Sequence, residues 1–345
     1  MLSICAAKLL FDESGTFRIL HLSDVHYRPG YPCRDVSGGT NMCTETNTTD
    51  FIARLIETAN PNLVVHTGDV IDGNSHSAAD AMDTLYGVSM SAGVKWTATL
   101  GNHDDDSDMN RPEVMEYIVQ LDKDSDNNLS QMNSLDRSYG NYYLELFAHE
   151  EDIQPVWRTF HIDSDTNNVS VNAAQTEWLR DTLQNIHQTP ALLFTHIPTK
   201  EYYSVLKDGV CGSIGESPSV APEGASELVP AILEEGSIKA VFVGHDHTND
   251  YCGLYANRLQ LCYEGSPGYQ GYGYCWPHNE KCYERRARVT EIQDYGSTVI
   301  SYKLVDDWPT TRAIDHQVLW GGKVDTCSKT VVSESEISLL KPLQT

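Results

Sequence analysis

Five short apolar segments of this chain each end in residues that commonly bind metal ions, and this recurring arrangement constrains the fold more than any other feature. The segments have the length and composition of strands, and parallel strands of an α/β sheet present functional residues at their carboxyl ends. The residues that follow them are Asp24-Val25-His26, Gly68-Asp69, Gly101-Asn102-His103, His196 and Gly244-His245-Asp246-His247. The pattern therefore predicts that five strands converge on one site.

The residue types at these five positions indicate the kind of metal. Apart from His103 and Asp246, they supply two carboxylates, one carboxamide and four imidazoles, and no thiolate. A set of oxygen and nitrogen ligands suits Zn, Fe or Mn better than Ca. We therefore expect two divalent or trivalent metal ions as cofactors. The predicted ligands are Asp24, His26, Asp69, Asn102, His196, His245 and His247.

Spacing along the chain suggests how some ligands share the ions. Asp24 and His26 are two residues apart and can reach a common ion where a strand ends in a turn. Asp69 is the natural bridging ligand. His245 and His247 would divide between the ions, with Asp246 pointing away.

Other polar residues accompany the predicted ligands. His103, beside Asn102, is available to protonate a leaving group. For Asp104–Asp106 we expect a solvated acidic loop rather than a calcium site. Arg285, Arg286 and Arg288 could bind substrate phosphate, although charges at a strand edge explain them equally well. The long segment 200–225 begins just after a ligand-bearing strand and could overhang the site.

Composition limits the choice of partners. With 24 basic and 49 acidic residues the net charge is −25, and binding to nucleic acid is not expected because it requires a basic face. A small phosphoester or a phosphoprotein is still possible as substrate, because bound metal ions dominate the local field. The chain of 345 residues shows no break in composition and no apolar stretch of transmembrane length. One large domain is therefore expected.

Cysteines and sequons point to the compartment. Nine cysteines are many for a cytosolic enzyme, and we expect disulfides Cys252–Cys262, Cys275–Cys282 and Cys33–Cys43, with at least one cysteine unpaired. N-glycosylation sequons at Asn47, Asn128 and Asn168 lie in polar segments. The chain is therefore expected to be a secreted or secretory-pathway glycoprotein, or cytoplasmic if its cysteines are reduced.

The order of helix and strand signals predicts the fold class. Strands and helices alternate as far as residue 245, and β-rich segments separated by Gly and Asp turns follow. Parallel units followed by antiparallel strands predict an α/β fold, a four-layer α/β/β/α sandwich of two mixed sheets. We expect an N-terminal extension at 1–16, the catalytic domain at 17–310 and a C-terminal tail at 311–345.

Several motifs together resemble the calcineurin-like metallophosphoesterase superfamily over about residues 17–305. Within it the chain resembles a purple-acid-phosphatase-related subgroup that includes plant "probable inactive" purple acid phosphatases and fungal Dcr2-type phosphatases. The motifs are Gly101-Asn102-His103-Asp104, Phe194-Thr195-His196-Ile197-Pro198, the segment 243–253, Leu261-Cys262-Tyr263, Gly271-Tyr272-Gly273 and the segment 285–289.

The resemblance implies a complete ligand set. It implies a first ion bound by Asp24, His26, Asp69 and His247, and a second bound by Asp69, Asn102, His196 and His245, with His103 as general acid or transition-state stabiliser. Purple acid phosphatases place a metal-bound tyrosine three residues after the bridging aspartate, where this chain has Asp72. The resemblance to protein phosphatases implies that Asp72 orients His103.

The expected reaction is the hydrolysis of phosphomonoesters by a metal-bound hydroxide, because the subgroup resemblance favours a phosphatase. One alternative is a phosphodiesterase acting on a cyclic nucleotide or a lipid headgroup, because a first site with the Asp24–His26 pattern serves diesterases too. The other alternative is a catalytically silent binding protein on the same scaffold.

Overall fold

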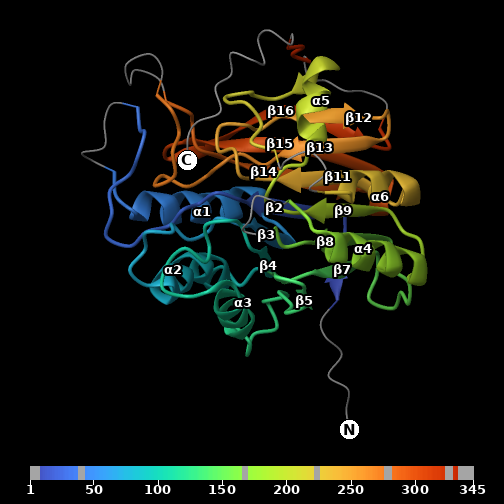
Figure 1. Cartoon of the computed structure of the whole chain (residues 1–345), viewed down its shortest axis with the longest axis horizontal. Helices are drawn as coiled ribbons and strands as arrows, with labels where there is room; N and C mark the ends of the chain where they lie inside the picture. The colour runs from blue at the N-terminus through green and yellow to red at the C-terminus, as the bar shows by residue number, and fades with distance from the viewer. Residues whose placement is uncertain are drawn as a thin grey trace.

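Two large β-sheets pack face to face in the computed structural model, and helices cover the outer face of each sheet (Figure 1). The model describes residues 8–37, 43–164, 170–220, 226–275, 282–322 and 329–332. The predicted four-layer α/β/β/α sandwich of two mixed sheets is confirmed.

The six-stranded sheet joins three parallel strands from the first third of the chain to three antiparallel strands from its end. Helices α1 (Thr46–Ala59), α2 (Ala78–Ser91) and α3 (Arg111–Gln120) contribute buried residues to the core that includes this sheet. In sheet order the strands are β16 (Thr310–Trp320), β15 (Thr298–Asp307), β14 (Arg286–Gln293), β2 (Phe17–Leu22), β3 (Leu63–Thr67) and β4 (Trp96–Thr99).

The eight-stranded sheet has a parallel centre with antiparallel strands beside it. Helices α4 (Ala173–Asn185) and α6 (Leu228–Glu235) pack on its outer face, and the short α5 (Glu201–Ser204) lies near β12 and β13. In sheet order the strands are β1 (Leu9–Leu10), β7 (Tyr142–Phe147), β8 (Trp157–His161), β9 (Ala191–Phe194), β11 (Ile238–Val243), β13 (Leu259–Tyr263), β12 (Cys252–Tyr255) and β10 (Val210–Cys211). A separate hairpin pairs β5 (Ser134–Leu135) with β6 (Ser138–Tyr139).

Alternation along strand β9 shows how the layers are built. Phe194 packs against the other sheet, where His21 of β2 contacts its ring with a centroid distance of 5.0 Å. Leu193 belongs instead to the outer core, which also contains Leu179 of α4. Successive side chains of a strand point to opposite faces, so a strand buried on both sides is apolar throughout. The uninterrupted apolar sequence of this strand therefore follows from its central position.

Two strands lie in stretches that we expected to flank the domain. Strand β1 pairs with β7, and β16 pairs with β15 along most of its length. The sheets therefore extend beyond both ends of the segment 17–310. Among the described helices, none has the length and hydropathy needed to cross a membrane.

The three expected disulfides are present, linking Cys33 to Cys43, Cys252 to Cys262 and Cys275 to Cys282. Cys211 is also disulfide-bonded, and Cys5 and Cys327 lie outside the described residues. The expectation of at least one unpaired cysteine can concern only Cys5 or Cys327, so it stays a prediction.

The sequons differ in their surroundings. Asn47 lies in the first turn of α1 rather than in a loop. The amide nitrogen of Asn128 donates to the carbonyls of Ile118 and Leu121 at 2.6 and 2.9 Å, so a glycan, which replaces one of its two hydrogens, would remove at least one of these hydrogen bonds. Asn168 lies outside the described residues.

Candidate dinuclear metal centre

All five predicted segments lie just past the carboxyl ends of parallel strands, as expected. Strands β2, β3 and β4 of one sheet lead to Asp24, Asp69 and Asn102. Strands β9 and β11 of the other sheet lead to His196 and His245. The site therefore lies where the ends of the two sheets meet.

The turns after these strands have unusual backbone conformations. Four predicted ligands have positive φ, a region that costs about 1–3 kcal/mol for a side-chain-bearing residue and is concentrated at functional sites. These residues are Asp24, His26, Asp69 and His245, with φ of 54°, 47°, 49° and 74°. At Gly68, with φ of 80°, an added Cβ would lie 2.5 Å from the amide nitrogen of Gly101. Only glycine lets these two loops approach so closely.

Six of the seven predicted ligands form two clusters, each with ligand atoms mutually within 4.8 Å. Asp69 Oδ2 lies between the clusters, because it is 3.1 Å from His196 Nε2 and 3.5 Å from His26 Nε2. This is the position that a bridging ligand requires. The first cluster is Asp24, His26 and His247, and the second is Asp69, His196 and His245.

Asn102, the seventh predicted ligand, lies beside the second cluster. Its Oδ1 is 2.9 Å from His245 Nδ1. Burial lowers the pKa of His245, which favours the neutral imidazole that a metal requires. Asp246 belongs to neither cluster and accepts hydrogen bonds from Ser219 N and the Tyr263 hydroxyl at 2.9 and 2.5 Å.

The histidine tautomers fit bound cations. His196 Nδ1 lies 2.8 Å from the carbonyl of Thr67 and must donate to it, since a carbonyl only accepts. In the neutral ring, Nε2 then presents a lone pair to the Asp69 carboxylate, and this buried atom has no hydrogen-bond partner. The Nε2 lone pair of His196 and the carboxylate of Asp69 repel each other, and a cation between them would remove this repulsion. Metal-binding histidines typically donate their other N–H to a carbonyl in this way.

The first cluster shows the same arrangement. His247 Nδ1 lies 3.1 Å from the carbonyl of Tyr272, which leaves Nε2 facing His26 Nε2 at 3.0 Å. Burial lowers the pKa of His26 to about 4 and also lowers the pKa of His247, which favours the neutral imidazoles that a metal requires. The donor set of both clusters therefore fits a pair of metal ions.

Electrostatics across the two clusters also call for a positive charge. Burial raises the pKa of Asp24 to about 8. Burial lowers the pKa of His196, but the carboxylates of Asp69 and Asp24 outweigh it and raise that pKa to about 10. Without metal, the carboxylates would therefore hold a proton on the ring between them.

Asp104 has a role that the sequence analysis missed. It is only 2% exposed, so the expectation of a solvated acidic loop is wrong for this residue. Its two carboxylate oxygens accept hydrogen bonds from the backbone amides of Asp69, Val70, Ile71 and Gly101 at 2.7–3.0 Å. The sequence signal for this role was the position of Asp104 directly after the ligand-bearing segment Gly101-Asn102-His103. Asp104 thereby fixes two of the metal-bearing loops to each other.

The carboxylate paired with His103 is not the one we expected. Asp106 Oδ2 lies 2.7 Å from His103 Nδ1, whereas the described hydrogen bonds of the Asp72 carboxylate go to Asn74. Asp106 follows His103 by one turn and so reaches its ring, while Asp72 caps its own turn. Burial lowers the pKa of His103, but Asp69 and Asp106 outweigh it and raise that pKa. Asp72 and His103 both line the cavity that opens over the two clusters.

The three arginines are neither phosphate ligands in the cavity nor charges at a solvated strand edge. Arg285 donates to the carbonyls of Tyr272, Gly271 and Arg34, and Arg286 pairs with Asp250 at 2.8 Å. Arg288 is fully buried. All three hold loops and strands together because they are buried among acceptors.

A cavity of about 530 Å³ opens over both clusters. Glu216, from the long segment 200–225, lies in its wall, so this segment borders the site as expected. The ring of Tyr272 stacks on His247 at a centroid distance of 3.7 Å, and its hydroxyl donates to Glu216 Oε2 at 3.0 Å. Neither Glu216 nor Tyr272 was recognised individually from the sequence.

Comparison with known proteins gives the family. The model of the calcineurin-like phosphoesterase family matches residues 17–249, which include every predicted ligand. The chain belongs to this family. Membership confirms the resemblance and makes the two clusters a candidate dimetal site of a calcineurin-like phosphoesterase.

Individual relatives agree with the predicted subgroup. The chain is 32% identical to "Probable inactive purple acid phosphatase 28" of Arabidopsis thaliana, over 90% of this chain and 86% of the relative. It is 27% identical to "Phosphatase DCR2" of Saccharomyces cerevisiae, over 88% of this chain and 56% of the relative. A dimetal phosphatase structure from Danio rerio has the same fold at a TM-score of 0.54 and 15% identity, covering 89% of this chain and 99% of that one.

Proposed function

We propose that this protein hydrolyses phosphomonoesters with two metal ions. One observation carries the proposal: two clusters of ligand-type atoms lie on either side of Asp69 Oδ2, and His103 lines the cavity above them. The proposed ligands are Asp24, His26, Asp69 and His247 for one ion, and Asp69, Asn102, His196 and His245 for the other.

When bound, two such ions lower the pKa of a water molecule and neutralise charge on phosphoryl oxygens. The chain's own residues supply orientation and a proton. The carbonyls of Thr67 and Tyr272 fix the rings of His196 and His247. Because Asp106 occupies Nδ1 of His103, Nε2 is the atom that can protonate the leaving oxygen. Asp106 thus takes the positioning role first considered for Asp72.

Comparison of two nitrophenyl esters tests the reaction class. We expect metal-loaded protein to show a higher kcat/KM on nitrophenyl phosphate than on bis(nitrophenyl) phosphate. The reverse order would identify a phosphodiesterase. Metal binding with no hydrolysis of either ester would identify a catalytically silent binding protein, in keeping with the word "inactive" in the name of the Arabidopsis relative.

We also propose that the protein matures in an oxidising secretory compartment. Three described disulfides support this, because such bonds are rare in the cytosol. Mass mapping of unreduced protein from its native source would test the compartment: free thiols at Cys33 and Cys43 would contradict it.

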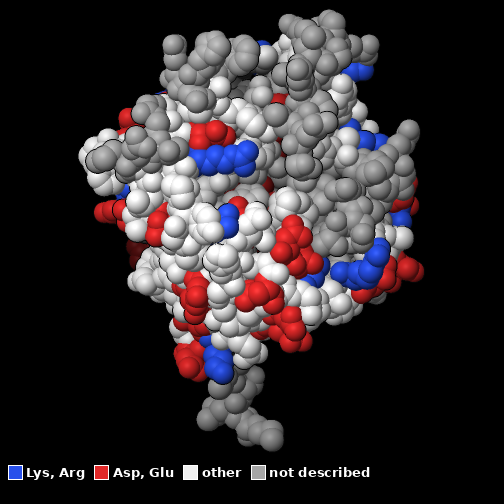
Figure 2. Space-filling view, turned by 60° about the vertical axis from the view of Figure 1, so that its left-hand side comes forward, with Lys and Arg blue, Asp and Glu red and all other residues white. Residues whose placement is uncertain are grey.

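Acidic and basic side chains are interspersed on the face shown in Figure 2, which suits an anionic small molecule or phosphoprotein better than a nucleic acid.

A further inference from the structure

We propose that Arg34 selects substrates that carry a second anionic group in addition to the reacting phosphate. A carboxylate on the leaving alcohol is the simplest such group. The inference rests on the proposed function, and it names the class of substrate that the same site would take.

The cavity has the size and charge that make such a contact valuable. Its volume of about 530 Å³ lies within the range of pockets for small organic ligands, so it holds more than the reacting phosphate. The carboxylates of Asp72, Asp106 and Glu216 line it and would repel an anionic tail. Among the residues described as lining it, Arg34 is the only lysine or arginine.

The guanidinium of Arg34 is available for a ligand. The side chain is 64% exposed, and its ion pair with Asp35 is loose, with Nε 3.7 Å from Oδ2. That same oxygen of Asp35 accepts a hydrogen bond from Gly273 N at 3.0 Å. Within the described part of the chain the guanidinium makes no hydrogen bond. It can therefore bind a carboxylate or phosphate through two parallel N–H groups.

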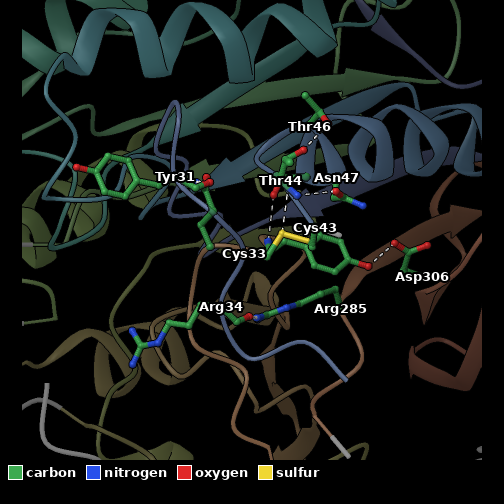
Figure 3. The surroundings of a disulfide bond; sticks show 12 residues. Tyr31, Cys33, Arg34, Cys43, Thr44, Thr46, Asn47, Arg285 and Asp306 are labelled. Atoms are coloured by element: carbon green, nitrogen blue, oxygen red, sulfur yellow. Dashed lines mark hydrogen bonds between the residues drawn. A yellow bond between two sulfur atoms is a disulfide. The ribbon is translucent and has the colours of Figure 1, made fainter. Parts of the chain in front are cut away.

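The backbone of Arg34, by contrast, is held on both sides. Its amide donates to the carbonyl of Tyr269 at 2.8 Å, and its carbonyl accepts from Arg285 Nη2 at 2.9 Å. The preceding residue, Cys33, is bonded to Cys43, and the side chain of Arg34 extends away from this disulfide and from Arg285 (Figure 3). A fixed backbone lowers the entropy lost when the side chain orders on a ligand.

Arg34 lies nearer to the solvent than the residues that would hold the metal ions and the reacting phosphate. The residues of the first cluster are at most 8% exposed, whereas Arg34 lies at the exposed rim of the same cavity. Arg285 connects the rim of the cavity to the first cluster. It donates to the carbonyls of Arg34 and Tyr272, and the ring of Tyr272 stacks on His247. A substrate whose phosphate reaches the clusters would therefore present the far end of its leaving group to Arg34.

A matched pair of esters tests the proposal. 3-Phosphoglycerate and glycerol 3-phosphate differ only by a carboxylate in place of a hydroxymethyl group. We expect Arg34→Gln to lower kcat/KM for 3-phosphoglycerate about 10- to 100-fold, mainly through KM, and to change it less than about twofold for glycerol 3-phosphate. Arg34→Lys should restore part of the preference, because it keeps the charge. Arg180→Gln, on α4 outside the cavity, is the control for loss of an arginine.

The outcomes separate this inference from the proposed function. Activity on both esters with the same ratio in wild type and Arg34→Gln would overturn the inference alone. Equal loss on both esters would place Arg34 on the reacting phosphate and would also overturn it. A metal-loaded wild type inactive on both esters and on nitrophenyl phosphate would overturn the proposed function, and the inference with it.

Discussion

Asp104 Oδ2 accepts a hydrogen bond from the backbone amide of Asp69 at 2.9 Å, so a residue outside both clusters holds the proposed bridging ligand in place. The same oxygen accepts from Gly101 N at 2.7 Å. The loops after β3 and β4 are thereby joined through one buried carboxylate. Contacts that orient metal ligands in this way typically cost roughly 10- to 100-fold in metal affinity when they are removed.

We predict that Asp104→Asn destabilises the protein by about 3 kcal/mol and lowers its metal content, because an amide nitrogen would face backbone N–H groups. Urea unfolding and elemental analysis would measure the two effects. Asp105→Asn is the matched control, because its partner Arg111 retains Asp163 as an ion-pair partner. Full metal content in Asp104→Asn would show that the loops hold their positions without this carboxylate.

His103→Ala tests the proton donor. Proton donation contributes roughly 10²–10⁴ in rate when the leaving group is poor, whereas nitrophenolate leaves readily without a proton. We therefore expect the variant to slow glycerol 3-phosphate hydrolysis far more than nitrophenyl phosphate hydrolysis, at unchanged metal content. Asp106→Asn should show the same dependence on the leaving group, but more weakly. Equal slowing of both esters would remove the general-acid role.

Stability should fall in acid because of buried neutral histidines. Burial lowers the pKa of His161 from the ordinary 6.5 to about 3, so the unfolded chain binds an extra proton between these values. The free energy of unfolding should therefore fall by up to about 1.4 kcal/mol per pH unit below about pH 6 for this residue. His161→Phe keeps an aromatic ring between Tyr142 and Phe194 and should reduce that slope. Urea unfolding at several pH values would measure it, and an unchanged slope would contradict this assignment.

The ligands could be predicted from sequence because local pattern and topology agree. His196 and His245 each follow a short apolar run with the length and composition of a buried parallel strand, and such strands end at one edge of a sheet. Cys252 and Cys262 flank a hairpin, so their pairing in register was also accessible. These inferences require only the periodicity of neighbouring residues.

The remaining features depend on contacts between distant segments. The acidic run at 104–106 does not show which partners its carboxylates contact: Asp104 accepts from four backbone amides, whereas Asp106 pairs with His103. Arg288 appears in the sequence as part of a basic run, yet Tyr263 O, Asp250 O and Ser301 Oγ surround its guanidinium. Burial of a charge is decided by partners that the local sequence does not show.

Elemental analysis of purified protein tests the central claim most directly. After incubation with Zn, Mn or Fe and dialysis, we predict about two ions per wild-type chain, one for each cluster. Asp69→Ala should retain less than one ion and lose nearly all phosphatase activity, because Asp69 Oδ2 lies within reach of both clusters. A wild-type protein that holds no metal under these conditions would contradict the dinuclear phosphatase that we propose.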